Sequence, residues 1–139
     1  MSVRNGDKLT PNIPAGELRI VLTWGSTPYD LDSHLTGPLS DGSRFHMYYP
    51  LSQSNGGSPW LQYVTLDLDD IYSFGPETTT VYQQLTGIYR FSVHDFSNRG
   101  SFSSIALSNS NATVVVYRGS ALSTRSRFRA IGGGTLDGI

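Results

Sequence analysis

The stretch Leu18-Arg19-Ile20-Val21-Leu22-Thr23-Trp24 decides the fold class. Its four even-numbered positions carry large apolar side chains and form one face, and the three odd-numbered positions, Arg19, Val21 and Thr23, form the other. A period of two residues is typical of a β-strand that has one face in a core. We therefore expect this stretch to be a strand with Trp24 in the core.

Segments of the same kind follow at short spacing along the chain. Each is bounded by Gly, Pro, Asn or Ser, and no segment carries the i, i+3, i+4, i+7 apolar stripe of a substantial helix. We therefore expect an all-β fold, a single β-sandwich domain of about eight or nine short, mostly antiparallel strands. The further strand candidates are Leu31 to Thr36, Arg44 to Tyr49, Leu61 to Asp69, Thr78 to Tyr82, Ile88 to His94, Ser104 to Ser108, Ala112 to Tyr117 and Arg127 to Ile131.

Composition limits the classes of function. The 139 residues fit one domain, and 10 Lys and Arg against 11 Asp and Glu leave no basic surface for nucleic acid or anionic lipid. No apolar run approaches the roughly 20 residues of a membrane-spanning helix, so we expect no membrane insertion. The absence of cysteine fits a bacterial surface protein or a cytosolic one.

Both ends of the chain are typical of connecting segments. Residues 1–16 are polar and contain Pro11, Pro14 and Gly16, which predicts a linker or lead-in, and residues 17–139 form the sandwich module. The run Gly132 to Gly134 is compatible with a linker or with a last edge strand beside it. We expect one module, monomeric, cut from a larger exported chain.

Two acidic runs predict a metal site. Asp30, Asp32 and His34 share one face of a strand that ends at Gly37-Pro38, and Leu66-Asp67-Leu68-Asp69-Asp70 repeats the Asp-Leu-Asp core. Clustered carboxylates repel one another, and Ca²⁺ relieves this because it takes six to eight oxygen ligands. The spacing is not that of an EF-hand, and Asp residues that only cap turns are the alternative. The predicted Ca²⁺ ligands are Asp30, Asp32, Asp67, Asp69, Asp70 and Glu77.

The three histidines, His34, His46 and His94, raise the question of zinc. They are scattered, no Cys accompanies them, and they would have to converge in space to bind an ion. A single His in a strand is more typical of a hydrogen-bonded surface or cleft residue. We therefore favour Ca²⁺ over Zn²⁺ for this chain.

A set of motifs resembles a family of bacterial cell-surface β-sandwich modules, distantly similar to YfaP-like domains. The match covers roughly residues 17 to 131, and the long motif from Trp24-Gly25 to Gly37-Pro38 is the most specific. The motifs are Leu22-Thr23-Trp24-Gly25, Pro28, Asp30-Leu31-Asp32-Ser33-His34-Leu35-Thr36-Gly37-Pro38, Phe45-His46-Met47-Tyr48-Tyr49, Leu66-Asp67-Leu68-Asp69-Asp70, Gly75-Pro76-Glu77-Thr78, Gly87-Ile88-Tyr89-Arg90 and Val93-His94-Asp95.

Some members of that family resemble the calcium-dependent peptide-binding domains of RTX adhesins. The resemblance implies a secreted module of a large bacterial surface adhesin that binds a peptide or protein on a host or neighbouring cell and performs no catalysis. The loop around Gln53 to Trp60 and the compact region from Tyr117 to Arg127 depart from the pattern, which puts the transfer of ligand choice in doubt.

Strand periodicity predicts a binding face beside the acidic runs. In Ile88 to His94 the polar set is Arg90, Ser92 and His94, and a metal with an open position beside Arg90 would take a ligand's terminal carboxylate. The alternatives are a calcium-dependent carbohydrate-binding module and, less favoured, a metal-dependent hydrolase. The predicted ligand-binding residues are His34, Arg44, His46, Tyr48, Trp60, Arg90 and His94.

Overall fold

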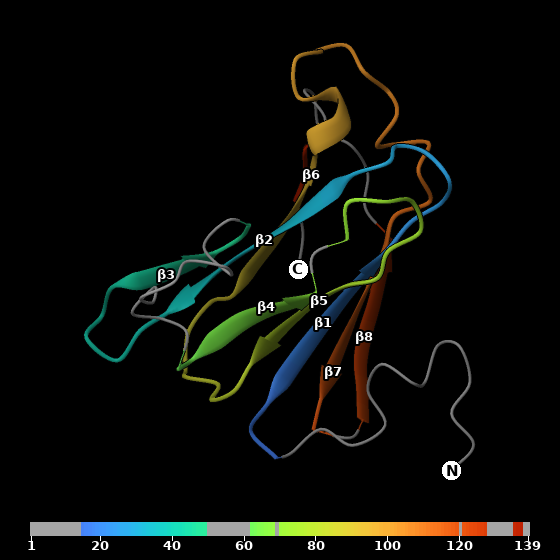
Figure 1. Cartoon of the computed structure of the whole chain (residues 1–139). Helices are drawn as coiled ribbons and strands as arrows, with labels where there is room; N and C mark the ends of the chain where they lie inside the picture. The colour runs from blue at the N-terminus through green and yellow to red at the C-terminus, as the bar shows by residue number, and fades with distance from the viewer. Residues whose placement is uncertain (1–14, 50–61, 69, 120, 128–134, 138–139) are drawn as a thin grey trace.

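The computed structural model describes residues 15–49, 62–68, 70–119, 121–127 and 135–137, and its regular elements are nearly all strands (Figure 1). Within this part of the chain the helical structure is confined to one 3-10 turn, and no helix is long and apolar enough to span a membrane. The elements are β1 (Leu18–Thr23), β2 (Leu31–Pro38), β3 (Arg44–Met47), β4 (Val64–Leu68), β5 (Glu77–Val81), β6 (Arg90–Asp95), the 3-10 turn η2 (Phe96–Asn98), β7 (Thr113–Arg118), β8 (Ala121–Arg127) and β9 (Thr135–Asp137).

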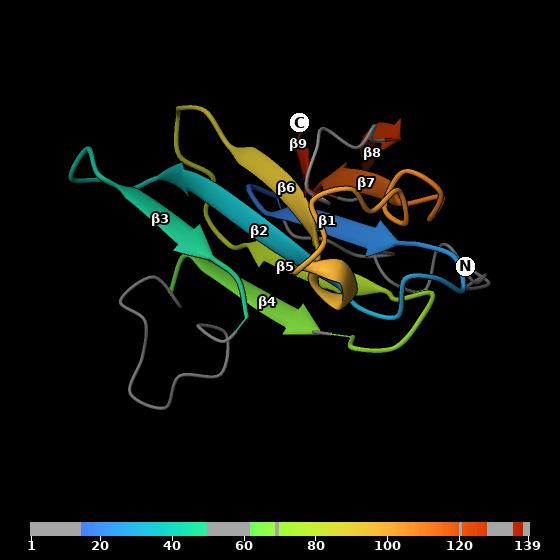
Figure 2. The same ribbon diagram turned by 90° about the horizontal axis from the view of Figure 1, so that it is seen from above.

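The strands form two antiparallel sheets that pack face to face (Figure 2). One sheet has five strands in the order β4-β5-β1-β7-β8, and the other has four in the order β3-β2-β6-β9. The prediction of an all-β sandwich of about eight or nine mostly antiparallel strands is therefore confirmed.

The core lies between the sheets and follows the predicted alternation. Leu18, Ile20 and Leu22 of β1 are buried, and Trp24 is 5% exposed and donates from Nε1 to the carbonyl oxygen of Pro28 at 2.9 Å. Val21, which the alternation places on the outer face, is buried as well, because β1 is a central strand flanked by β5 and β7. The core cluster comprises Leu18, Ile20, Leu22, Trp24, Leu31, Leu35, Phe45, Met47, Val64, Leu66, Val81, Phe91, Val93, Leu107, Ala112, Val114 and Val116.

Near the C-terminus the structure differs from the strand predictions at two segments, and it decides between linker and edge strand at a third. The segment Ser104 to Ser108 is not a strand but lies in a succession of turns that bury Leu107. The strand β8 is not among the predicted strands. The predicted strand Arg127 to Ile131 shares only Arg127 with β8, and residues 128–131 lie outside the described residues. Thr135–Asp137 forms the edge strand β9 on β6, whereas Gly132 to Gly134 also lies outside the described residues.

The turn before β5 is built against Trp24 and fixes where β5 begins. Gly75 has φ +75°, and a Cβ there would lie 2.8 Å from a ring carbon of Trp24 and 2.9 Å from the carbonyl oxygen of Leu22. Glycine is required because both the backbone conformation and the space exclude a side chain. Glu77, the first residue of β5, is thereby held opposite Leu22.

Candidate metal and ligand-binding site

The candidate site lies on the outer face of the four-stranded sheet. Along β2, Leu31, Ser33 and Leu35 are buried, so Asp32 and His34 project outward. The neighbouring strands add side chains to this face, because cross-strand partners point the same way. Asp32 faces His94, His34 faces Ser92, and Thr36 faces both His46 and Arg90.

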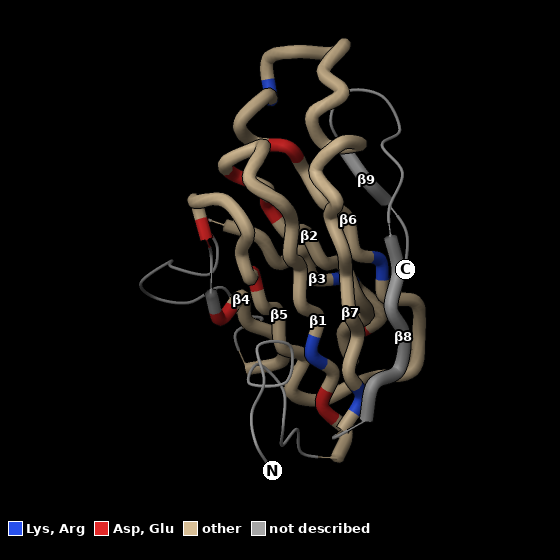
Figure 3. The backbone as a smooth tube through the Cα atoms, turned by 90° about the vertical axis from the view of Figure 1, so that its right-hand side faces the viewer, with Lys and Arg blue, Asp and Glu red and all other residues tan. Residues whose placement is uncertain are grey.

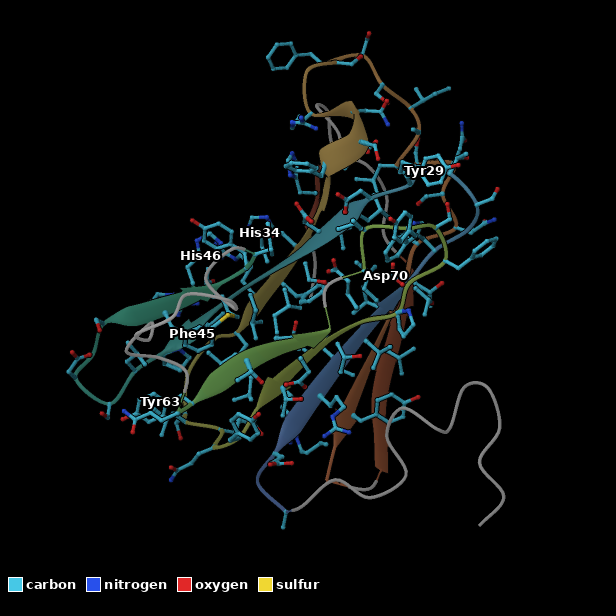
Figure 4. All side chains as sticks on the ribbon, in the orientation of Figure 1. Tyr29, His34, Phe45, His46, Tyr63 and Asp70 are labelled. Carbon is cyan, nitrogen blue, oxygen red and sulfur yellow. The ribbon has the colours of Figure 1, made fainter. Side chains whose placement is uncertain are left out.

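These outward side chains line a groove of about 460 Å³ on the sheet. Polar residues of β3 and β6 therefore border the same groove, on the faces that the alternation of side chains predicted. Figure 4 shows His34 and His46 together on the same side of the sheet, well separated from Asp70. The groove is lined by His34, Thr36, His46, Arg90, Ser92 and His94.

The three histidines form one cluster. His34 Nδ1 lies 2.9 Å from His46 Nε2, which is hydrogen-bonding distance. The ring of His94 meets His34 edge-on with centroids 6.0 Å apart, and Tyr48 stacks on His34 with centroids 5.0 Å apart and planes 9° from parallel. Tyr48 also contacts His46, at 4.4 Å between centroids. The convergence that a histidine metal site requires is therefore present.

Burial lowers the pKa of two histidines of this cluster, His34 and His46. The pKa of His34 is lowered to about 4, first because burial removes the charged ring from water and then because His46 and His94 repel its charge. Burial also lowers the pKa of His46. At neutral pH the His34 ring is uncharged, and a neutral imidazole can ligate a metal ion or accept a hydrogen bond.

A group of carboxylates adjoins the groove at the start of β2. Carboxylate oxygens of Asp30, Asp32 and Glu77 lie within 4.8 Å of one another. The backbone of Asp30 is held by Ser97, whose Oγ accepts from Asp30 N–H at 2.9 Å. Figure 3 shows acidic positions near this end of β2, with others far from it on the five-stranded sheet.

Glu77 reaches this group from the opposite sheet. It pairs with Leu22 across β5 and β1, which turns its side chain into the space between the sheets, and it is 0% exposed. Its Oε2 accepts a hydrogen bond of 2.7 Å from the backbone N–H of Ser33 on β2. The carboxylate of Glu77 therefore links the two sheets at the site where it approaches Asp30 and Asp32.

The other predicted acidic ligands do not join this group in the structure. Asp67 lies on the outer face of the five-stranded sheet, where its carboxylate accepts from the hydroxyls of Thr65 and Thr80. Asp70 accepts from the backbone N–H of Tyr72 at 2.8 Å, the turn-capping role that was the alternative for these residues. Asp69 lies outside the described residues.

The predicted ligand-binding residues differ in where they lie relative to the groove. Arg90 lines the groove together with the three histidines. Arg44 lies at its rim, where its guanidinium donates to Thr36 Oγ1 at 3.2 Å and to the carbonyl oxygen of Ile88 at 2.8 Å. Tyr48 stacks on the histidines, and Trp60 lies outside the described residues.

Sequence reasoning omitted Thr36 and Ser92 from the ligand-binding residues. Both occupy outward positions of β2 and β6, in the same alternation as His34 and His94, and both line the groove. The alternation therefore contained the signal for them. The hydrogen bond between Ser33 N–H and Glu77 had no such signal, because it joins strands of different sheets.

Asp32 belongs to two groups of metal-ligand atoms. The first is Asp30, Asp32 and Glu77, an all-oxygen set that suits a hard cation such as Ca²⁺. The second is Asp32, His34 and His94, with ligand atoms again within 4.8 Å of one another, a mixed nitrogen and oxygen set that suits Zn²⁺ or a similar ion. The two sets meet at one carboxylate beside the groove.

Comparisons with known proteins give no relative for this chain: no family model matches it, and neither does a curated protein or a solved structure.

Proposed function

We propose that the chain is a calcium-dependent ligand-binding module that takes a short peptide in the groove of its four-stranded sheet. The observation that supports this is the position of Asp32, which belongs to the carboxylate group and faces His94 of the groove. An ion held by Asp30, Asp32 and Glu77 would therefore lie beside a peptide bound in the groove.

The oxygen count of the carboxylate group favours a ligand that completes it. Three carboxylates supply three oxygens if each binds through one atom, or six if each binds through two, and Ca²⁺ takes six to eight. The remaining positions are open to water or to an oxygen of the bound molecule. Because Glu77 arrives from the other sheet, the ion also bridges the sandwich and stabilises it.

Arg90 gives the groove a preference for a carboxylate. It is exposed, it lines the groove, and a guanidinium binds a carboxylate through two parallel hydrogen bonds. The imidazoles and Thr36 add hydrogen-bonding groups for a peptide along the groove. The proposed ligand is therefore a peptide with a free C-terminus, whose carboxylate Arg90 binds in the groove.

The biological setting is part of the same proposal. The motif from Trp24 to Pro38 resembles bacterial surface modules, and the setting that follows is a secreted adhesin whose module binds a partner on a host or neighbouring cell. The activity proposed is binding, without turnover of the bound peptide.

The test is a titration of a peptide library by fluorescence anisotropy, in excess CaCl₂ and in chelator. Each peptide is used as the free acid and as the C-terminal amide, and a panel of mono- and disaccharides is titrated in parallel. Arg90→Gln removes the guanidinium of the groove, and Arg99→Gln removes one at η2, where it packs on Phe96, as the matched control.

Binding of free-acid peptides that needs calcium, weakens on amidation and weakens in Arg90→Gln but not in Arg99→Gln is the expected result. Equal affinity for acid and amide would refute the carboxylate preference. Binding of sugars in place of peptides would assign the groove to glycans, and peptide binding unchanged by chelator would refute the role of the ion.

A further inference from the structure

The chain contains three histidines, and all three lie in the groove. They come from three strands, since His46 is on β3, His34 on β2 and His94 on β6. Calcium has little use for imidazole nitrogen, because it selects oxygen ligands. The carboxylate group therefore accounts for Glu77 and Asp30 but leaves the histidine cluster without a role in metal binding.

We propose a second metal site of a different class, in which Asp32, His34 and His94 bind Zn²⁺ or a similar borderline divalent ion. The ligand atoms of these side chains lie within 4.8 Å of one another. Small side-chain adjustments would bring them to the separation of about 3.4 Å that tetrahedral bonds of about 2.0–2.2 Å to Zn²⁺ require. Two imidazoles and one carboxylate are a known ligand set for such ions. The inference does not depend on the proposed function, because zinc binding by these three side chains can be measured in the absence of calcium and of peptide.

The hydrogen bond between His34 and His46 orients a ligand of the proposed ion, although His46 is not itself a ligand. His34 Nδ1 is engaged by His46 Nε2 at 2.9 Å, so the atom that we assign to the ion is His34 Nε2. A metal-ligating histidine almost always donates its other N–H to a neighbouring group, which fixes the tautomer and the ring orientation. Tyr48, stacked on His34, restrains the same ring. His46 is therefore a positioning residue for the ion.

The position of the site leaves one coordination position open to the groove. Three protein ligands with a fourth position open is the arrangement of zinc sites that exchange water for another ligand. Because His34 and His94 line the groove, a group of a bound molecule would enter that position from the groove. A carboxylate or an imidazole of a peptide is the class of group that fits.

Asp32 makes the two ions interdependent. It is shared by both ligand groups, whereas Glu77 belongs to the oxygen set alone and His94 to the mixed set alone. Substitution of Glu77 should therefore weaken calcium binding and leave zinc binding intact, and substitution of His94 should weaken zinc binding and leave calcium binding intact. Asp32→Asn weakens both.

The experiment titrates the chelator-treated, dialysed protein with ZnCl₂ by isothermal calorimetry, with CoCl₂ as a coloured substitute that reports the ligand set. The variants are His34→Gln, His94→Gln, His46→Phe and Glu77→Gln. Asp41→Asn, on the exposed turn between β2 and β3, is the control for a carboxylate outside both groups. Melting curves of each variant establish that it folds.

The expected result is one equivalent of Zn²⁺, bound in the wild type, in Asp41→Asn and in Glu77→Gln. His46→Phe keeps a ring but loses the nitrogen, and it weakens the site by about 10- to 100-fold as outer partners do. His34→Gln and His94→Gln weaken it further. Absence of saturable binding by the wild type, or an affinity unchanged in both His34→Gln and His94→Gln, would overturn the proposal.

A measurement on the wild type keeps the test independent of folding defects. Long-range proton–nitrogen NMR spectra resolve the six imidazole nitrogens of the three histidines. Saturation with ZnCl₂ should move one nitrogen resonance of His34 and one of His94 into the metal-bound range, while excess CaCl₂ alone should not. Imidazole spectra that are unchanged at zinc saturation would also overturn the proposal.

Discussion

Two substitutions of Glu77 separate its structural role from its proposed role at the ion. Glu77 is fully buried, and its Oε2 accepts the Ser33 N–H at 2.7 Å. Glu77→Gln keeps the side-chain length and an acceptor oxygen but removes the charge. Glu77→Ala removes the charge and the acceptor together. The carboxylates of Asp30 and Asp32 lie within 4.8 Å, so both variants relieve the same repulsion.

The difference between the two variants can be estimated from these contacts. An unsatisfied buried N–H at Ser33 costs about 1–3 kcal/mol. The buried methylene group that alanine lacks contributes about 0.8 kcal/mol. In chelator, Glu77→Ala should therefore be less stable than Glu77→Gln by about 2–4 kcal/mol. For a chain of this size, 1 kcal/mol of stability shifts the melting temperature by about 3 °C. The two variants should therefore differ in melting temperature by about 6–12 °C.

Whether Glu77→Gln raises or lowers the melting temperature, with and without calcium, tests the ion site. Two ionised carboxylates at the upper bound of 4.8 Å repel by about 3 kcal/mol at an effective dielectric constant near 20. In chelator, Glu77→Gln should therefore melt at or above the wild-type temperature. In calcium at 100 times its dissociation constant, the wild type gains about 2.7 kcal/mol, and the variant should lose this gain.

Calorimetric melting curves of the wild type and both variants, in CaCl₂ and in chelator, provide the measurement. A calcium-dependent shift that persists in Glu77→Gln would refute the assignment of this side chain to the ion. Equal destabilisation by the two substitutions in chelator would refute the role of the Ser33 hydrogen bond.

Two further predictions concern the four-stranded sheet that carries the groove. The pKa of folded His34 is lowered to about 4 from an ordinary value of 6.5, so the unfolded chain takes up the proton first as pH falls. Stability should be full above pH 6.5 and fall between pH 6.5 and 4, by about 1–2 kcal/mol once solvent screening of the partly exposed ring is allowed for; urea unfolding across this range should show a flatter curve for His34→Gln. Gly37→Ala should cost about 1–3 kcal/mol, because its Cβ would lie 2.5 Å from the ring of Phe45, whereas Gly100→Ala meets no atom within 4 Å and should be close to neutral in the same assay.

Periodicity predicted the fold class and the groove from the sequence, because both depend on which side chains alternate within one strand. In Arg90–Asp95, the outward positions Arg90, Ser92 and His94 follow from the burial of Phe91 and Val93. The same rule predicted that His46 points to the outer face of β3 and Phe45 to the core. The convergence of the histidines then followed from the pairing of β2 with both strands, which no single strand reveals.

The composition of the acidic group could not be predicted in the same way. Asp67 turns outward because it alternates with the buried residues Val64 and Leu66 of β4. Glu77 turns inward opposite Leu22, but all five residues of β5 are buried and four of them are polar, so alternation does not reveal which face Glu77 takes. The burial of Glu77 is possible because Ser33, on the facing sheet, donates a hydrogen bond to it.

The hydrogen bond from Ser33 to Glu77 also makes one backbone amide a reporter of the site. Most amides of β2 report the integrity of their own sheet, whereas that of Ser33 is bonded to a carboxylate of the other sheet. Its hydrogen-exchange rate therefore follows the separation of the two layers, and its nitrogen chemical shift follows the charge state of Glu77. An isotope label at this single position would follow ion binding and the closing of the sandwich in one spectrum.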